Sequence, residues 1–307
     1  MSEYLPEGEL ILREENKLLT RSLHGLEECL SSGKIIEAPC TVCDNSHNLI
    51  VDFGFMKGII PHDEGAVGIT DGTTRDIALI SRVNKAVCFK VTGFSKENGV
   101  TTAILSRRLA QEECILNYLN KLGCGDIVKV RVTHLEQFGC FVDIGCGIPS
   151  LIPIDAISVS RITHPADRFF VGQKILAVVK NRDNGKITLT HKELLGTWEE
   201  NAANFHAGET VAGIVRSIES YGIFVELAPN LAGLAEIKEG VKVNQHASVY
   251  IKALIPEKMK IKLIIVDTVD SGYAAGGFNY FIKSGHIDHW NYSVEGADKR
   301  IETTFVP

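Results

Sequence analysis

Two pairs of aromatic residues recur in this sequence with the same spacing around a glycine. Phe138 and Phe141 stand three positions apart, and Tyr221 and Phe224 repeat that spacing. The glycine permits a bulge or a close backbone approach, which would bring both rings of a pair onto one face. Exposed rings stack on nucleic-acid bases and contribute about 1–3 kcal/mol per base. We therefore expect a site for single-stranded nucleic acid. The alternative is that one ring of each pair belongs to the core.

A lysine follows each aromatic pair in a short basic hairpin. Lys186 lies in the stretch 184–190, and Lys260 lies in the stretch 257–263. Lysines beside stacking rings hold phosphates, although both could also be solvated turn charges. Two copies that combine two rings with a lysine favour binding. The candidate site therefore consists of Phe138, Phe141, Lys186, Tyr221, Phe224 and Lys260.

These residues lie in an internal repeat. Residues 125–144 align without a gap with residues 208–227, and a weaker copy begins at Gly33. Both good copies alternate apolar and polar residues, which predicts β-strands with one buried face. Five-stranded barrels of about 70 residues bind single-stranded nucleic acid on their second and third strands. We expect a mainly β fold of tandem five-stranded oligonucleotide-binding (OB-fold) barrels joined by short helices.

Helical spacing separates the copies. Residues 108–122 and 192–205 lack β-branched alternation, and residues 15–30 place five leucines on one stripe. The stripe predicts a helix that packs on the first barrel or, alternatively, docks on a partner protein. The expected order is an N-terminal helical segment (1–32), a divergent first barrel (33–109), a linker helix (110–124), a second barrel (125–192), a linker helix (193–207), a third barrel (208–270) and a C-terminal extension (271–307).

Charge and hydropathy narrow the function classes. The chain of 307 residues has a net charge of −6, but between residues 125 and 192 Lys and Arg outnumber Asp and Glu. Phosphate binding requires local rather than global positive charge. No run approaches the roughly 20 apolar residues of a membrane span, and the first residues are acidic rather than a basic leader. We expect a cytoplasmic protein without a membrane partner.

Two clusters in the sequence contain residue types that can bind a metal. Cys40 and Cys43 form a CxxC without a second pair, so buried reduced thiols on a strand are the preferred interpretation. His286, Asp288 and His289 lie on an extended segment whose side chains point to opposite faces, which favours a packed surface strand. The sequence therefore predicts no metal and no cofactor.

The repeat resembles the RNA-binding domain named after ribosomal protein S1 of the bacterial small subunit. The resemblance rests on Val211-Ala-Gly-Ile-Val215, Tyr221-Gly-Ile-Phe-Val225 and Leu231-Ala-Gly-Leu234, together with the matching residues of the second copy. It implies an OB barrel whose RNA face carries two aromatics, a histidine after the Gly-Leu turn, an aspartate and a basic hairpin residue. The aromatic and basic positions fall on the six candidate residues.

The other polar positions of the family are altered in this chain. The resemblance places the histidine on Pro153 and Ala235, and the aspartate on Asn181 and Pro256. We therefore expect a lower affinity or a weaker base preference than in a domain with the full pattern.

The first copy departs further, because His47 and Ile50 occupy its aromatic positions. In the ribosomal protein, the N-terminal copies resemble docking modules for the small subunit, and later copies hold messenger RNA. The same division is expected here, with the small ribosomal subunit as partner of the N-terminal region.

The sequence thus predicts a non-enzymatic protein that binds single-stranded RNA, foremost messenger RNA at the small ribosomal subunit. The alternatives are an RNA-processing or regulatory module away from ribosomes and a protein-interaction scaffold. Such barrels are also appended to nucleases. An enzyme is disfavoured, since the sequence has no P-loop, GxSxG, HExxH or Rossmann glycine run.

Overall fold

The structure is a computed structural model that describes residues 4–183, 185–270 and 277–306. Asn184 of the predicted hairpin, the first residues of the N-terminal segment, and positions 271–276 and 307 of the predicted extension lie outside the described residues. The chain divides into two compact units. The N-terminal unit comprises residues 1–122 and 143–149, and the C-terminal unit comprises residues 123–142 and 150–307.

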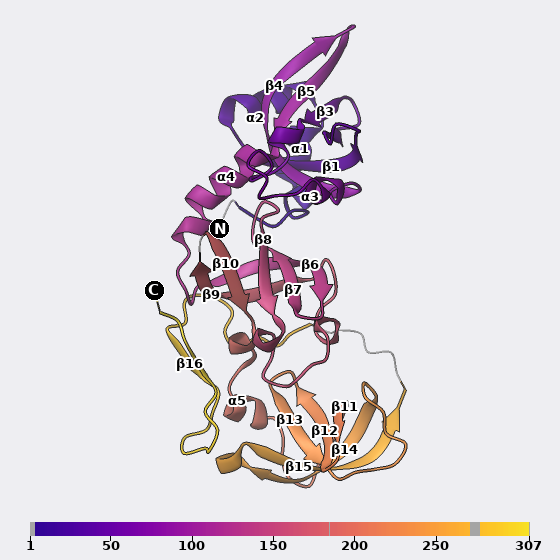
Figure 1. Ribbon diagram of the computed structural model, residues 1–307, viewed down its shortest axis with the longest axis vertical. Coiled ribbons are helices and arrows are strands. Elements are labelled where there is room, and N and C mark those ends of the chain that lie inside the picture. Colours follow the sequence, from indigo (N-terminus) through magenta and orange to yellow (C-terminus); the bar gives the residue numbers. More distant parts are fainter. Residues whose placement is uncertain (1–3, 184, 271–276, 307) are drawn as a thin grey trace. The chain divides into compact units, whose positions relative to one another are not determined.

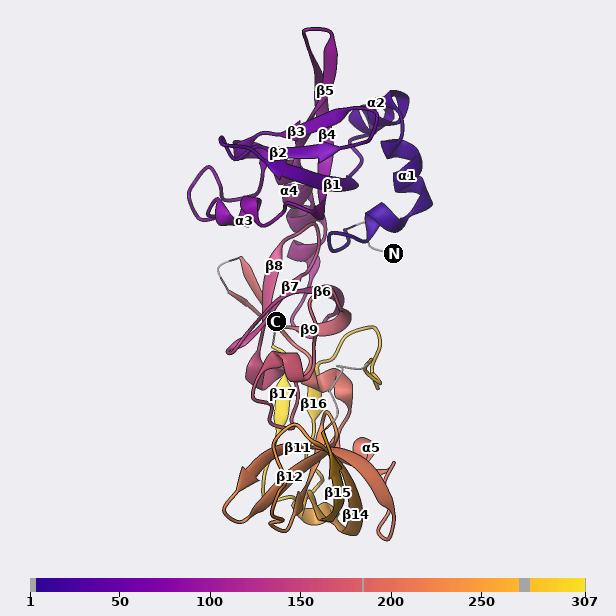
Figure 2. The ribbon, with the colours of Figure 1, turned by 90° about the vertical axis from the view of Figure 1, so that its right-hand side faces the viewer.

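The first barrel is a closed sheet with the strand order β1-β2-β3-β5-β4 (Figure 1). Its strands are β1 (Ile36–Cys43), β2 (Leu49–Asp52), β3 (Lys57–Ile60), β4 (Lys85–Glu97) and β5 (Val100–Ser106). The β4–β5 hairpin remains paired to its tip, where Glu97 faces Val100, and it extends beyond the other strands (Figure 2). The connection from β3 to β4 contains η2 (His62–Glu64) and α3 (Ile77–Ile80).

Short helices precede this barrel: η1 (Leu10–Leu12), α1 (Glu14–Thr20) and α2 (Leu23–Ser32). The single helix predicted over residues 15–30 is wrong, because Ser22 begins a new helix by accepting a hydrogen bond from the backbone N–H of Gly25. Leu19 and Leu26 pack in the core of the first barrel. The break gives the two short helices different buried faces, so the other three leucines of the predicted stripe are exposed: Leu18, Leu23 and Leu30.

The second barrel is closed in the order β10-β8-β7-β6-β9. Its strands are β6 (Ile127–Glu136), β7 (Gly139–Asp143), β8 (Pro149–Pro153), β9 (Lys174–Asp183) and β10 (Lys186–Thr190). The connection from β8 to β9 contains η4 (Ile154–Ala156) and η5 (Pro165–Asp167).

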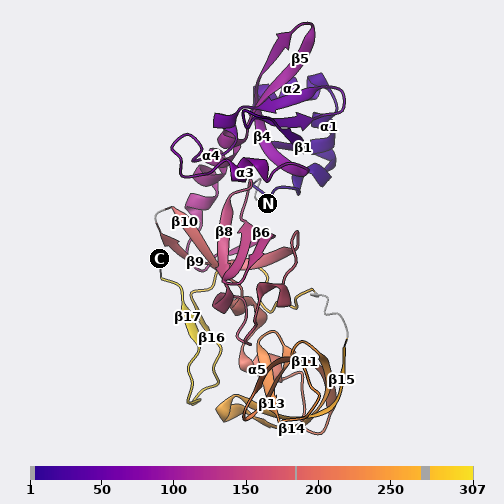
Figure 3. The same cartoon turned by 45° about the vertical axis from the view of Figure 1, so that its right-hand side comes forward.

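The third barrel is closed in the order β11-β12-β13-β15-β14 (Figure 3). Its strands are β11 (Thr210–Glu219), β12 (Gly222–Ala228), β13 (Leu231–Ala235), β14 (His246–Ile255) and β15 (Lys260–Val269), with η7 (Pro256–Lys258) in the last hairpin. The predicted fold class, tandem five-stranded barrels joined by short helices, is confirmed. The predicted domain boundaries stay predictions.

Both expected helical linkers are present. After the first barrel come α4 (Arg107–Asn117), capped by the Ser106 hydroxyl, and η3 (Leu119–Lys121). After the second barrel come η6 (Lys192–Leu195) and α5 (Trp198–Ala202), where Thr197 and Glu200 form a capping box. No helix in the described part of the chain is long and apolar enough to cross a membrane.

The described C-terminal residues pack within the C-terminal unit. Strands β16 (His289–Asn291) and β17 (Glu302–Thr304) form an antiparallel pair. Apolar side chains of this segment belong to the hydrophobic cluster that contains the core of the third barrel and the linker residues Leu194 and Trp198: Ile287, Trp290, Tyr292 and Phe305. The prediction of a packed surface strand at His289 and Trp290 is therefore confirmed.

The eight cysteines are free thiols in this structure. Cys40 is buried in the core of the first barrel, as expected. Cys43 is only half-buried because it ends β1, so the expectation of a buried thiol is wrong for this residue.

Candidate nucleic-acid interface

The turn between β6 and β7 presents the first aromatic pair. Phe138 lies in the turn and is 57% exposed, whereas Phe141 on β7 is half-buried. Their ring centroids are 5.9 Å apart with an interplanar angle of 89°. A Cβ at Gly139 would lie 2.5 Å from the carbonyl oxygen of Ile152. Glycine is therefore required for β7 to approach β8 and for both rings to share one face.

The third barrel repeats this arrangement. Tyr221 is 68% exposed, Phe224 is half-buried, and their centroids are 6.1 Å apart at 88°. A Cβ at Gly222 would lie 2.7 Å from the carbonyl oxygen of Ala235, which is the same close approach. None of the four rings is buried, so the second and third barrels each present one edge-to-face pair to solvent.

Strand register places Phe224 in a row of outward side chains. Phe224 on β12 faces Ser217 on β11 and Leu234 on β13. Leu234 in turn faces Lys262 on β15. Lys262 is not among the predicted site residues, although its position two residues after Lys260 indicates a shared strand face.

The predicted lysines are exposed in both barrels. Lys186 is the first residue of β10, and Lys260 is the first residue of β15. Each begins the strand next to the third strand of its barrel, because β10 pairs with β8 and β15 pairs with β13. Positive charge thus borders the aromatic face in each case, as phosphate contacts require.

The pairing register corrects two of the altered family positions. Thr188 faces Leu151 in the second barrel, and Lys262 faces Leu234 in the third. The third-barrel counterpart of Pro153 is therefore Glu236 rather than the buried Ala235.

The second correction concerns the aspartate position. Thr188 also faces Asn181, and Lys262 faces Ala253, so Ala253 rather than Pro256 is the counterpart of Asn181. The hairpin between β14 and β15 is longer, because it contains η7. A gapless comparison with the shorter hairpin of the second barrel cannot detect this insertion.

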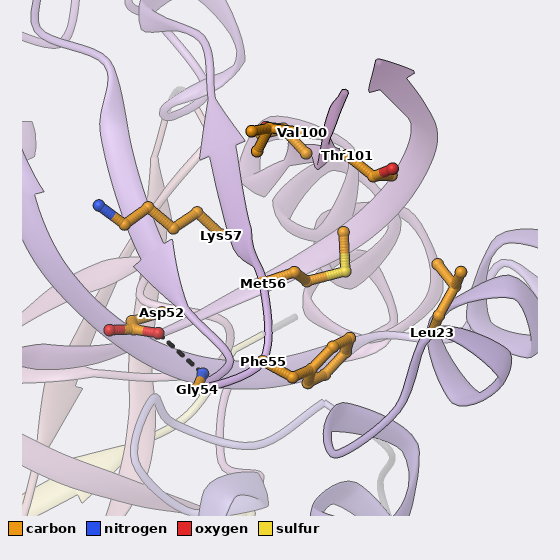
Figure 4. Close-up of a pocket in the computed structure, with 9 residues that line it drawn as sticks. Leu23, Asp52, Gly54, Phe55, Met56, Lys57, Val100 and Thr101 are labelled. Carbon is orange, nitrogen blue, oxygen red and sulfur yellow. Dashed lines mark hydrogen bonds between the residues drawn. The ribbon is translucent and has the colours of Figure 1, made fainter. Parts of the chain in front are cut away.

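The first barrel presents a different surface. His47 and Ile50 occupy the aromatic positions, as expected, and neither is fully buried. The turn from β2 to β3 instead lines an open cavity of about 650 Å³ (Figure 4). Leu23, Phe55, Met56 and Val100 supply its apolar walls, with Asp52 accepting a hydrogen bond from the Gly54 N–H.

The chain is similar in sequence to known RNA-binding and ribosomal proteins. Residues 121–192 match the family model of the S1 RNA binding domain, which covers the second barrel. The chain is 29% identical over 271 residues to small ribosomal subunit protein bS1 of Staphylococcus aureus strain COL, covering 85% of this chain and 65% of that protein. It is 30% identical over 268 residues to the bS1 protein of Staphylococcus haemolyticus, with the same coverage. The resemblance predicted from the sequence is confirmed.

Among solved structures, the chain can be superposed on a protein with nucleic acid binding domains. A multidomain protein with nucleic acid binding domains from Streptococcus pneumoniae aligns with a TM-score of 0.26 at 13% identity, covering 76% of this chain and 73% of that chain.

Proposed function

We propose that this chain, whose residues 121–192 match the S1 RNA binding domain, binds single-stranded RNA on the aromatic faces of its second and third barrels. The observation that carries the proposal is the repeated ring pair. Phe138 with Phe141 and Tyr221 with Phe224 share nearly identical centroid distances and angles, and in each pair the outer ring is more than half exposed. Exposed rings beside lysines are what base stacking and phosphate contact require.

We further propose that the bound RNA is messenger RNA and that the N-terminal region contacts the small ribosomal subunit. The support is the similarity to proteins named small ribosomal subunit protein bS1. This chain spans 65% of the length of those proteins. The first barrel lacks the ring pair, so its face is free for a role other than stacking. Such a role would place the protein in the cytoplasm.

Fluorescence anisotropy with a labelled single-stranded RNA tests the binding faces. The combined variant Phe138→Ala, Tyr221→Ala removes the outer ring of each pair. We expect its Kd to rise about tenfold or more, because each lost stack contributes about 1–3 kcal/mol. The matched control is Tyr250→Ala. Tyr250 is an exposed tyrosine on β14 that pairs with Thr210, at the opposite end of β11 from the turn that carries Tyr221.

Equal weakening by Tyr250→Ala, or unchanged binding by the combined variant, would contradict the assignment of these faces. No RNA binding at low salt would instead favour a protein-interaction scaffold. The ribosome contact is tested by co-sedimentation of the full chain with small subunits. If the N-terminal region makes this contact, the combined variant still co-sediments; loss of co-sedimentation would show that the ring faces themselves hold the subunit.

A further inference from the structure

The first barrel brings together three side chains that are distant in sequence. His47 lies in the turn between β1 and β2, where its φ of 59° is unusual for a non-glycine residue. The Asp44 carboxylate fixes this turn by accepting hydrogen bonds from the backbone N–H groups of Ser46 and Asn48. The imidazole of His47 is thereby held at the edge of the barrel by a structured turn.

His62 and Asp76 reach this imidazole from the connection between β3 and β4. The His62 backbone N–H donates to Oδ1 of Asn48 at 2.9 Å, which ties the two segments together. The Asp76 carboxylate lies between the two rings. Its Oδ1 is 2.7 Å from Nε2 of His62, and its Oδ2 is 3.6 Å from Nδ1 of His47.

We propose that His47, His62 and Asp76 bind a divalent transition-metal ion, with Zn²⁺ as the best match. One donor atom from each residue lies within 4.8 Å of the other two, the one such group among the described residues. Tetrahedral zinc with bonds of about 2.0–2.1 Å separates its ligands by about 3.3 Å, so small side-chain rotations bring these donors into place. Two imidazoles and a carboxylate suit zinc and leave a fourth position for water.

The surroundings support a built site rather than a chance ion pair. Asp76 precedes α3, yet its carboxylate makes no helix-capping hydrogen bond and is directed to the two imidazoles. The Asn48 side chain joins the turn that carries His47 to the backbone of His62. This hydrogen bond holds together the two backbone segments from which the imidazoles extend.

His286 also lies beside carboxylates, but its surroundings do not form a metal site of this kind. Nδ1 of His286 is 2.7 Å from Asp126, and its Nε2 is 3.4 Å from Asp288. The two ring nitrogens are thus engaged by two separate carboxylates. Their donor atoms do not converge on one point, as those around Asp76 do.

A zinc ion here would give the first barrel a distinct role. His47 occupies the position of the outer rings Phe138 and Tyr221. The ion would link the β1–β2 turn to the long connection between β3 and β4, where the other barrels offer a ring for stacking. This inference is independent of RNA binding.

Isothermal titration of the full, EDTA-treated and thiol-reduced chain with Zn²⁺ tests the site. We expect one strong site, with His47→Ala and His62→Ala each weakening it at least tenfold. His286→Ala is the matched control, because it removes a histidine that is paired to a carboxylate at the same 2.7 Å distance. Circular dichroism of the metal-free variants checks that they remain folded.

Co²⁺ used as a spectroscopic probe identifies the ligands. We expect visible absorption from nitrogen and oxygen ligation without the intense thiolate charge-transfer bands that bound cysteines produce. The absence of Zn²⁺ binding at micromolar concentrations would overturn the proposal. So would strong thiolate bands, or binding by folded His47→Ala and His62→Ala variants that equals the binding of the unaltered chain.

Discussion

The turn after the first strand carries a different ring in each barrel: His47, Phe138 or Tyr221. Each turn lies outside the barrel core, so its side chain is not constrained by packing and can diverge in chemistry. A phenyl or phenol ring there is suited to stacking on a base. The imidazole of His47 pairs with the imidazole of His62 rather than with a phenyl ring, and it approaches the carboxylate of Asp76.

The strand register places Lys262 beside the aromatic face of the third barrel. It lies one strand beyond Leu234, which faces Phe224, so a phosphate next to a stacked base would be within its reach. Lys262→Ala should weaken RNA binding and flatten the dependence of log K on log salt concentration by about 0.7, the contribution of one phosphate contact in single strands. Anisotropy titrations at several salt concentrations measure this slope.

Lys252→Ala is the control for that measurement. Lys252 is an exposed lysine on β14, a strand that pairs with β11 and β15 and not with β12 or β13. An equal change of slope in both variants would mean that Lys262 contributes only to the general charge of the barrel.

At the scale of elements, β1 contains a buried acid that joins the N-terminal segment to the first barrel. The Glu37 carboxylate accepts hydrogen bonds from the backbone N–H groups of Gly8 and Ile11. The pKa of Glu37 is raised to about 8, mainly by burial and also by the nearby charges of Glu7 and Asp143. Burial and the charge of Glu7 likewise raise the pKa of Asp143 to about 7.

These raised pKa values predict a pH-dependent stability. Above its ordinary pKa of 4.5 and up to about pH 8, Glu37 keeps a proton in the folded state that the unfolded chain releases. The stabilisation that the protonated Glu37 gives the folded state is therefore full below pH 4.5. It is lost as the pH rises toward 8, and the free energy of unfolding falls by about 1.4 kcal/mol per pH unit at most. Asp143 acts in the same direction over a lower window.

Glu37→Gln should reduce this dependence, because it removes the titrating group and keeps an acceptor oxygen. Calorimetry at pH 5.5 and pH 8 should show a smaller fall in Tm for the variant than for the unaltered chain. Glu27→Gln on the exposed face of α2 is the control. The interpretation fails if Glu37→Gln and the unaltered chain lose the same Tm between the two values.

At the scale of the whole molecule, the second and third barrels share a buried charge cluster within the C-terminal unit. Arg168, from the connection between β8 and β9, donates to the Glu226 carboxylate on β12. Arg216 on β11 donates to the same carboxylate through Nε at 2.9 Å. All three side chains are at most 5% exposed. One carboxylate therefore contacts two buried guanidinium groups from two barrels, and Oδ1 of Asp167 lies 3.6 Å from Nη1 of Arg216.

Glu226→Ala should destabilise this unit by roughly 3–5 kcal/mol, because it removes the carboxylate that both buried guanidinium groups contact and leaves Arg216 with Asp167 at 3.6 Å. Arg168→Met should cost less, since Glu226 keeps Arg216. Urea unfolding followed by tryptophan fluorescence reports on this unit, because Trp198 and Trp290 both belong to its core. An equal loss from the two variants would show that the coupling through Glu226 is not the main contribution.

Local pattern in the sequence was sufficient for the barrels and the ring pairs. Alternating strands and close glycines act between near neighbours, so the positions of Phe138, Phe141, Tyr221 and Phe224 could be predicted before the fold was known. Both linkers are helical where expected, and the side-chain caps of Ser106 and Thr197 that the structure shows there are also local interactions.

Long-range geometry decided the rest. His62 and Asp76 are 14 residues apart and lie in the connection between β3 and β4, so only the closed barrel brings them to His47. The leucine stripe is interrupted because Ser22 starts a new helix, and the longer hairpin at η7 shifts the register to Ala253. Periodicity specifies which face of a strand is buried, but only closure of the sheet determines which distant residues share a face.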